Sequence, residues 1–181
     1  MKYMIISDIH GDLQCLQKAM ERFEEEKADV LLALGDLLYH GPRNDLPRDY
    51  APKEVISILN SMKERFLCVR GNCEAEVDQM VLEFPVMADY CALMWEGRVI
   101  YATHGHVHGE TNPPPLGPDG ILLCGHTHVP CCNRHEAFTY VNPGSTSIPK
   151  NGSCHSYAVL EGNTMIWKNL EGGEYMRENL W

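Results

Sequence analysis

Apolar, strand-like runs recur along this 181-residue chain, and five of them end in a short polar motif. The motifs are Asp8-Ile9-His10, Gly35-Asp36, Gly71-Asn72, Thr103-His104 and Gly125-His126-Thr127-His128. Short apolar runs bounded by glycine-containing loops are typical of buried strands. Ligands of open α/β sheets bind at the carboxyl ends of the strands, so we expect all five motifs to meet at one rim.

The first seventy residues predict alternating strands and helices. We expect strands over 2–7, 30–34 and 66–69, a helix over 13–26 capped by Asp12, and a second helix over 52–64. A long loop over 37–52 separates the second strand from the second helix. This β-α-β-α-β order predicts a parallel sheet with right-handed crossovers.

The second half of the chain predicts mainly strands. We expect hairpins over 90–95 with 98–103 and over 156–160 with 165–170, a strand-like run at 121–124, and a loop over 108–120. No linker or repeat divides the sequence. We therefore predict a single α/β domain over 1–181, with two layered sheets and helices outside them.

The charge, the cysteines and the lack of long apolar runs limit the classes of function and the compartments that we expect for this chain. A formal net charge of -10 disfavours bulk nucleic-acid binding, although bound cations would let a small phosphorylated substrate approach. The eight cysteines show neither CxxC nor zinc-ribbon spacing, which predicts free thiols in a reducing cytoplasm. No apolar run approaches the ~20 residues of a membrane span, and the N-terminus does not resemble a secretory signal.

The side chains of the five motifs favour a metal centre. Asp8 and His10 are two residues apart and so share one face of an extended backbone, as do His126 and His128. Asp36 and Asn72, taken alone, are better explained as turn residues beside Gly35 and Gly71. Mixed imidazole, carboxylate and amide ligands suit Mn²⁺, Fe or Zn²⁺.

Together the motifs resemble those of the calcineurin-like metallophosphoesterase superfamily, as D-x-H at 8–10, G-D at 35–36, G-N-C at 71–73, His104, and G-H-x-H at 125–128. The resemblance extends from residue 2 to about residue 170. The segments RGNCEAEVDQ, CGHTHVP and NPGSTSIPK are most similar to the small bacterial YfcE-type phosphodiesterases. This resemblance implies a four-layer α/β/β/α fold.

The resemblance also implies two divalent ions, with Mn²⁺ expected and Zn²⁺, Fe or Mg²⁺ as alternatives. One ion would be held by Asp8, His10, Asp36 and His128, and the other by Asp36, Asn72, His104 and His126. The Asp36 carboxylate would bridge them. The implied reaction is hydrolysis of a small phosphodiester by in-line attack of a hydroxide shared by both ions.

Cys73 departs from the pattern, because many members of the superfamily have a histidine after the asparagine. A thiol is neutral near its reference pKa of ~8.5 and donates weakly, so we predict a preference for diesters with good leaving groups over alkyl monoesters. The alternative is that Cys73 is a passive turn residue. His40 and Arg43 are candidates for phosphate binding, or else solvated loop residues. His106 and His108 continue the alternation from His104 but match no family position.

Two other functions stay open from the sequence. The same centre would serve a phosphomonoesterase or protein phosphatase, and small members of this fold, such as the retromer subunit that resembles them, act as interaction scaffolds that a metal site can stabilise. We also expect a homodimer, since exposed hairpin edges and the C-terminal tail with Tyr175 and Trp181 can pair between copies.

Overall fold

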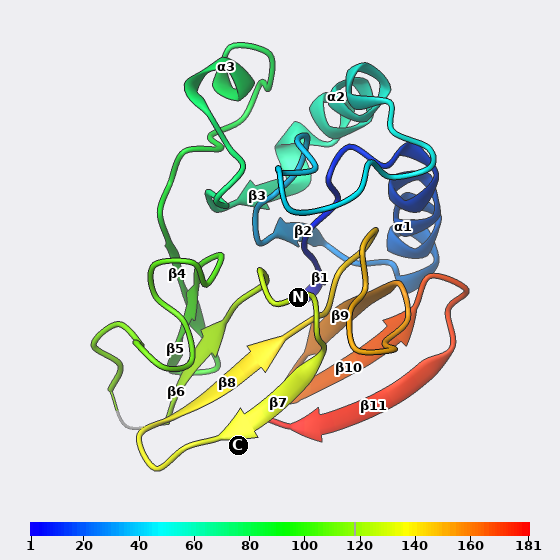
Figure 1. The fold of residues 1–181 in the computed structure, drawn as a ribbon. Coiled ribbons are helices and arrows are strands. Elements are labelled where there is room, and N and C mark those ends of the chain that lie inside the picture. Colours follow the sequence, from blue (N-terminus) through cyan, green and yellow to red (C-terminus); the bar gives the residue numbers. More distant parts are fainter. Residues whose placement is uncertain (118) are drawn as a thin grey trace.

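Two stacked sheets form the centre of the computed structural model, which describes residues 1–117 and 119–181 (Figure 1). The first sheet has the order β11-β10-β9-β1-β2-β3. Its strands are β1 (Lys2–Ile6), β2 (Val30–Ala33), β3 (Phe66–Cys68), β9 (Ser156–Glu161), β10 (Thr164–Asn169) and β11 (Glu174–Asn179). The second sheet has the order β4-β5-β6-β8-β7. Its strands are β4 (Cys91–Trp95), β5 (Arg98–Ala102), β6 (Gly120–Leu123), β7 (Cys131–Arg134) and β8 (Phe138–Asn142).

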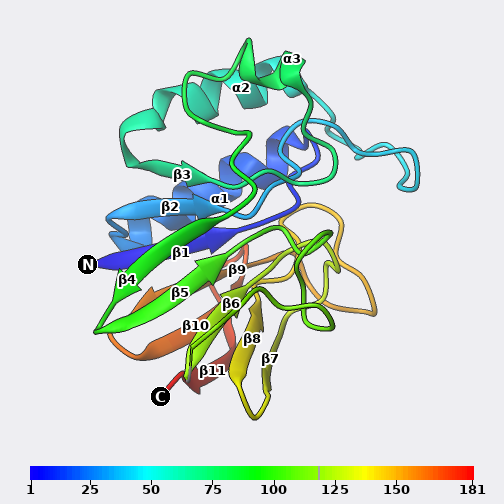
Figure 2. The same cartoon turned by 90° about the vertical axis from the view of Figure 1, so that its left-hand side faces the viewer.

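Helices α1 (Leu13–Glu26) and α2 (Pro52–Ser61) pack on the outer face of the first sheet. The short 3-10 helix η1 (Lys63–Arg65) and α3 (Glu76–Gln79) lie on the same side and bury no residue of their own. The Asp12 carboxylate caps α1 as predicted, accepting a hydrogen bond from the Cys15 N–H at 2.8 Å. Figure 2 shows this helical layer on one side of β1–β3 and the second sheet on the other.

Both faces of β1 are buried, as its continuous apolar sequence predicts. Met4 and Ile6 pack with the helices, whereas Tyr3 and Ile5 pack between the sheets. The largest fully buried side chain in the described residues, Trp167, also lies between the sheets and donates its indole N–H to the Asn142 carbonyl at 2.7 Å. The core is therefore continuous from the helices into the space between the sheets.

The predicted α/β fold with two layered sheets is confirmed. β1, β2 and β3 are parallel, β4 with β5 and β9 with β10 are antiparallel hairpins, and β5, β6 and β8 are parallel. The outward face of the second sheet carries a small cluster around Leu122, Phe138 and Tyr140. This cluster is covered by Leu116 and Tyr101, and no helix of the described residues packs there.

Three strands were not predicted. β7 and β11 are edge strands with half-polar sequences, CCNR and EYMREN, and β8 lies parallel to β6 in the interior of the second sheet. The expected helix over 52–64 is divided into α2 and η1. The predicted loop over 108–120 includes residue 118, which lies outside the described residues. No helix of the described residues is long and apolar enough to cross a membrane.

The strand register brings the five motifs together. Ile6, Ala33 and Cys68 align across β1, β2 and β3, and Ala102 aligns with Leu123 across β5 and β6. Each of these strands ends at the same edge of its sheet, and each motif begins within a few residues of the strand end. The prediction of a single rim is therefore confirmed.

Candidate metal centre

The backbone turns sharply at most of the predicted ligands. Asp8, His10, Asp36, His126 and His128 have φ values of 58°, 50°, 56°, 64° and 62°. They are five of the nine non-glycine residues with positive φ in the described chain. This left-handed conformation is uncommon outside glycine, although Asp and His adopt it more readily than most residues. Such conformations cluster at functional sites, where the surrounding structure holds them in place.

The first group of ligands consists of Asp8, His10 and His128. The Asp8 Oδ1 lies 3.6 Å from the His10 Nε2 and 3.2 Å from the His128 Nε2, and these two nitrogens are 3.5 Å apart. The Nδ1 atoms of His10 and His128 lie 2.8 and 2.6 Å from the carbonyl oxygens of Tyr39 and Ile148. When Nδ1 carries the proton for these bonds, both Nε2 lone pairs face inward.

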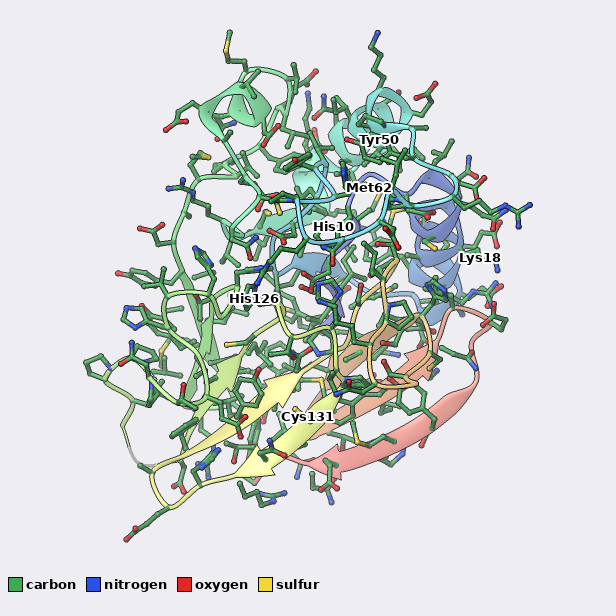
Figure 3. The ribbon with its side chains drawn as sticks, viewed as in Figure 1. His10, Lys18, Tyr50, Met62, His126 and Cys131 are labelled. Carbon is green, nitrogen blue, oxygen red and sulfur yellow. The ribbon has the colours of Figure 1, made fainter. Side chains whose placement is uncertain are left out.

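The second group consists of His104, His126 and Asn72. The His104 Nε2 lies 3.2 Å from the His126 Nδ1 and 3.1 Å from the Asn72 Oδ1. The other nitrogen of His104 is 2.6 Å from the Leu34 carbonyl oxygen, which fixes the ring as in the first group. Figure 3 shows His10 and His126, one from each group, near the middle of the molecule, where loops from the two sheets meet.

Asp36 connects the two groups. Its Oδ2 lies 3.8 Å from the His10 Nε2 and 3.5 Å from the His104 Nε2. Its Oδ1 accepts a hydrogen bond from the Cys73 N–H at 2.9 Å, which leaves Oδ2 directed toward both histidines. A single carboxylate oxygen therefore faces both halves of the site.

The donor set fits a pair of cations. Asp8 is fully buried, and its Oδ1 has no hydrogen-bond partner among the described residues. With Nδ1 of His10 and His128 protonated, two lone pairs would face each other across 3.5 Å, an arrangement that requires a positive charge between them. Carboxylate groups and imidazole rings also lie within ligand distance of one another in the sets Asp8-His10-His128 and Asp8-Asp36-His104.

The pKa values also indicate that the buried carboxylates of the centre favour a positive charge nearby. Burial raises the pKa of Asp8, but the neighbouring imidazoles of His10 and His128 outweigh burial and hold it well below its usual value. Burial lowers the pKa of His104, but the Asp36 and Asp8 carboxylates outweigh burial and raise it to about 9. Burial and then the neighbouring His104 lower the pKa of His126 to about 4. Without cations, a proton on His104 supplies part of the missing charge.

Glu74 supports the centre from outside, a role that our sequence analysis did not assign. It is 5% exposed, and its carboxylate accepts the backbone N–H groups of Asp36 at 2.9 Å, Leu37 at 2.7 Å and Gly71 at 2.5 Å. Burial, then the nearby Asp36 charge, raises its pKa. This carboxylate ties the loop that carries Asp36 to the loop that carries Asn72.

The segment after β8 holds the Asp8 turn. The hydroxyls of Ser145 and Ser147 donate to the Asp8 carbonyl oxygen at 3.0 and 2.9 Å, and the Thr146 N–H donates to the Ser7 carbonyl oxygen at 2.9 Å. Gly144 has a φ of 83°, and a β-carbon there would lie 2.3 Å from the Ser156 Oγ, so only glycine fits.

The remaining predicted residues lie at different distances from the centre. Cys73 belongs to it, since its thiol forms a potential ligand group with His10 and Asp36. Burial, then the Asp36 charge, raises the Cys73 pKa. His40 packs edge-on against Tyr39 and Tyr50, with ring centroids 4.8 and 5.5 Å away. Arg43 is exposed on the same loop. Phosphate binding by His40 and Arg43 stays a prediction.

Comparison with known proteins gives the family. Residues 1–165 match the model of the calcineurin-like phosphoesterase superfamily domain. The chain belongs to this superfamily, which confirms the resemblance, the α/β fold with two layered sheets and the assignment to the phosphoesterases. The described residues place no helix on the outer face of the second sheet, so the second helical layer of the expected four-layer arrangement is not observed there.

Individual relatives agree with this assignment. The chain is 43% identical to Phosphodiesterase YfcE of Escherichia coli (strain K12) over 165 residues, covering 91% of this chain and 90% of that protein. A solved structure of YfcE, a phosphoesterase from E. coli, superposes with a TM-score of 0.96 at 40% identity and covers 99% of this chain and 100% of that one. Vacuolar Protein Sorting 29 from Cryptosporidium parvum shares the fold at a TM-score of 0.63 and 16% identity, covering 98% of this chain and 97% of that one.

Proposed function

We propose that this protein is a two-metal phosphodiesterase. The observation that carries the proposal is the Asp36 Oδ2, which faces one histidine of each group at 3.8 and 3.5 Å. The first ion would be held by Asp8, His10, Asp36 and His128, and the second by Asp36, Asn72, His104 and His126. When bound, a pair of divalent cations lowers the pKa of an attached water and offsets charge on phosphoryl oxygens.

The protein's own groups prepare the site for this chemistry. Backbone carbonyl groups hold the rings of His10, His104 and His128, so that their inward nitrogens stay available as ligands. Asn72 is exposed at the second group, which places its amide where a substrate enters. The nucleophile is a water, and no side chain of the centre forms a covalent intermediate.

Cys73 is proposed to lie beside the leaving group. Its raised pKa keeps the thiol protonated at neutral pH, so it can donate only a weak hydrogen bond to a departing oxygen. General acid assistance contributes roughly 10²–10⁴-fold where a good acid is present, and a thiol supplies little of it. Esters whose leaving group departs as a weakly basic oxyanion depend least on protonation of that oxygen. Diesters with aryl or nucleotidyl groups are therefore the proposed substrate class.

Mn²⁺ is the proposed metal on the basis of the resemblance to the YfcE-type phosphodiesterases, since the mixed nitrogen and oxygen ligands suit Mn²⁺, Fe or Zn²⁺ alike. The eight cysteines, all in the described part of the chain, are free thiols as predicted. Free thiols, including the adjacent Cys131 and Cys132, support the proposal of a reducing cytoplasm.

The test is hydrolysis of bis-p-nitrophenyl phosphate and p-nitrophenyl phosphate by metal-stripped protein supplied with Mn²⁺, Mg²⁺, Zn²⁺ or nothing. We expect turnover only with added metal, highest with Mn²⁺, and faster on the diester. Absence of turnover with every metal, in protein shown to be folded by circular dichroism, would refute an enzymatic role. Faster hydrolysis of the monoester would replace the diesterase proposal with a phosphomonoesterase.

A further inference from the structure

A pocket of about 240 Å³ lies beside the metal centre, and two stacked tyrosines form one of its walls. The rings of Tyr90 and Tyr101 are nearly parallel at 14°, with centroids 4.7 Å apart. Tyr90 is 55% exposed, although a large aromatic ring is stabilised by burial. The pocket is smaller than the 300–1,000 Å³ typical of sites for whole drug-sized ligands, so its volume suits one part of a substrate.

His106 links this pocket to the metal centre. Its side chain is exposed and lines the pocket, and its ring centroid lies 5.4 Å from that of His104 and 6.2 Å from that of His126. His106 therefore borders both the pocket and the second group of ligands, so a phosphoryl group bound at that group would lie next to the pocket.

The pocket wall is anchored to the same loops that carry the ligands. The Arg70 N–H donates to the Ala88 carbonyl oxygen at 2.8 Å, two residues before Asn72. The Thr103 hydroxyl donates to the Asp89 carbonyl oxygen at 3.1 Å, one residue before His104. These bonds fix the segment that leads to Tyr90, so the aromatic surface is formed before a substrate binds.

We infer that this pocket binds one neutral, planar aromatic group of the diester, either an aryl group or a nucleobase, by stacking on the tyrosine pair. Stacking requires a flat ring but no particular pattern of hydrogen bonds, which matches a wall made of two phenol rings. The Asp89 side chain also lines the pocket and disfavours a second phosphate there. The inference rests on the proposed diesterase function and adds the class of group that the site selects.

The experiment compares phenylphosphonate with methylphosphonate as inhibitors of bis-p-nitrophenyl phosphate hydrolysis by the Mn²⁺-loaded enzyme. The two inhibitors carry the same anionic group and differ in the aromatic ring. We expect phenylphosphonate to bind roughly tenfold more tightly than methylphosphonate, in line with the contribution of one aromatic stack. Tyr90→Ala should remove this difference by weakening phenylphosphonate alone, and Tyr90→Phe should retain it.

Met94→Ala is the matched control, because Met94 is 75% exposed on β4 but does not line the pocket. Equal inhibition of the wild-type enzyme by both phosphonates, or an unchanged ratio in Tyr90→Ala, refutes the aromatic pocket while the diesterase activity stands. An enzyme inactive with every metal refutes the proposed function itself. A change in molar mass of Tyr90→Ala by light scattering would instead identify this face as a contact between copies and overturn the inference.

Discussion

Glu74→Gln tests whether one buried carboxylate holds the two central loops in place. Glutamine has nearly the same shape but only one acceptor oxygen. If that oxygen occupies the Oε2 position, it still accepts hydrogen bonds from the backbone N–H groups of Asp36 and Gly71. The NH2 group of the glutamine then takes the place of Oε1 and faces the Leu37 N–H, so the 2.7 Å hydrogen bond from Leu37 is lost. A lost charge-assisted bond with an unsatisfied buried donor costs about 1.5–3 kcal/mol.

That cost can be measured by urea unfolding of the metal-free protein. With an m value of about 2 kcal/mol per M, the midpoint should fall by roughly 1 M at constant m. Displacement of Asp36 and Asn72 should also weaken Mn²⁺ binding about 10–100-fold by calorimetry, the usual effect of losing a group that orients ligands. Glu76→Gln is the control, because Glu76 is exposed at the start of α3. A Glu74→Gln urea midpoint within about 0.2 M of the wild-type midpoint corresponds to a destabilisation below about 0.4 kcal/mol. That result would refute the role of this carboxylate in holding the two loops.

Three further changes test the centre directly. Asp36→Asn should lower diester turnover by at least about 100-fold with unchanged circular dichroism, because the shared oxygen loses its charge; retained turnover would exclude the shared role. Cys73→His should raise hydrolysis of phenyl phosphate more than that of p-nitrophenyl phosphate, because only the poorer leaving group needs a proton; an equal effect on both would exclude Cys73 from the leaving-group side. In the metal-free protein, His104 has its pKa raised from 6.5 to about 9, so its stabilisation is complete below about pH 6.5 and is lost as the pH rises through 9. Over that range the free energy of unfolding, measured from the urea midpoint, should fall by at most about 3.4 kcal/mol from this group. His104→Gln should reduce the fall, and the remainder would come from His10, whose pKa is also raised.

The sequence predicted the centre better than it predicted the sheets around it. Strands β1, β2 and β6 are continuous apolar runs with both faces buried, so their ends, and the motifs that follow, are readable from composition alone. β7 and β11 lie at sheet edges and none of their side chains is buried, so neither shows an apolar run or a clear alternation.

Glu74 shows a different limit of sequence analysis. Its partners are three backbone N–H groups, which any residue type supplies, so no pairing of side chains marks it in the sequence. Its only signal is its position two residues after Asn72, within a segment already noted for its resemblance to phosphodiesterases. The stacking of Tyr90 on Tyr101 is equally hidden, because the contact depends on how the segment before β4 meets β5.

Five ligand residues have a left-handed backbone conformation, which indicates that the backbone of the centre is held in place by the fold. A residue held in this conformation costs of order 1–3 kcal/mol, so five of them carry a strain comparable to the roughly 5–15 kcal/mol by which a typical domain is stable. Such strain persists only if the backbone is held by other contacts, and here the Asp8 and His10 N–H groups donate to the carbonyl oxygens of Gly35 and Asp36 at 3.1 and 2.9 Å. These bonds join the ends of β1 and β2, whose positions are set by the core. Packing of the strand ends therefore brings together the inward nitrogens and the unpartnered Asp8 oxygen, and bound cations would supply the positive charge that these groups need.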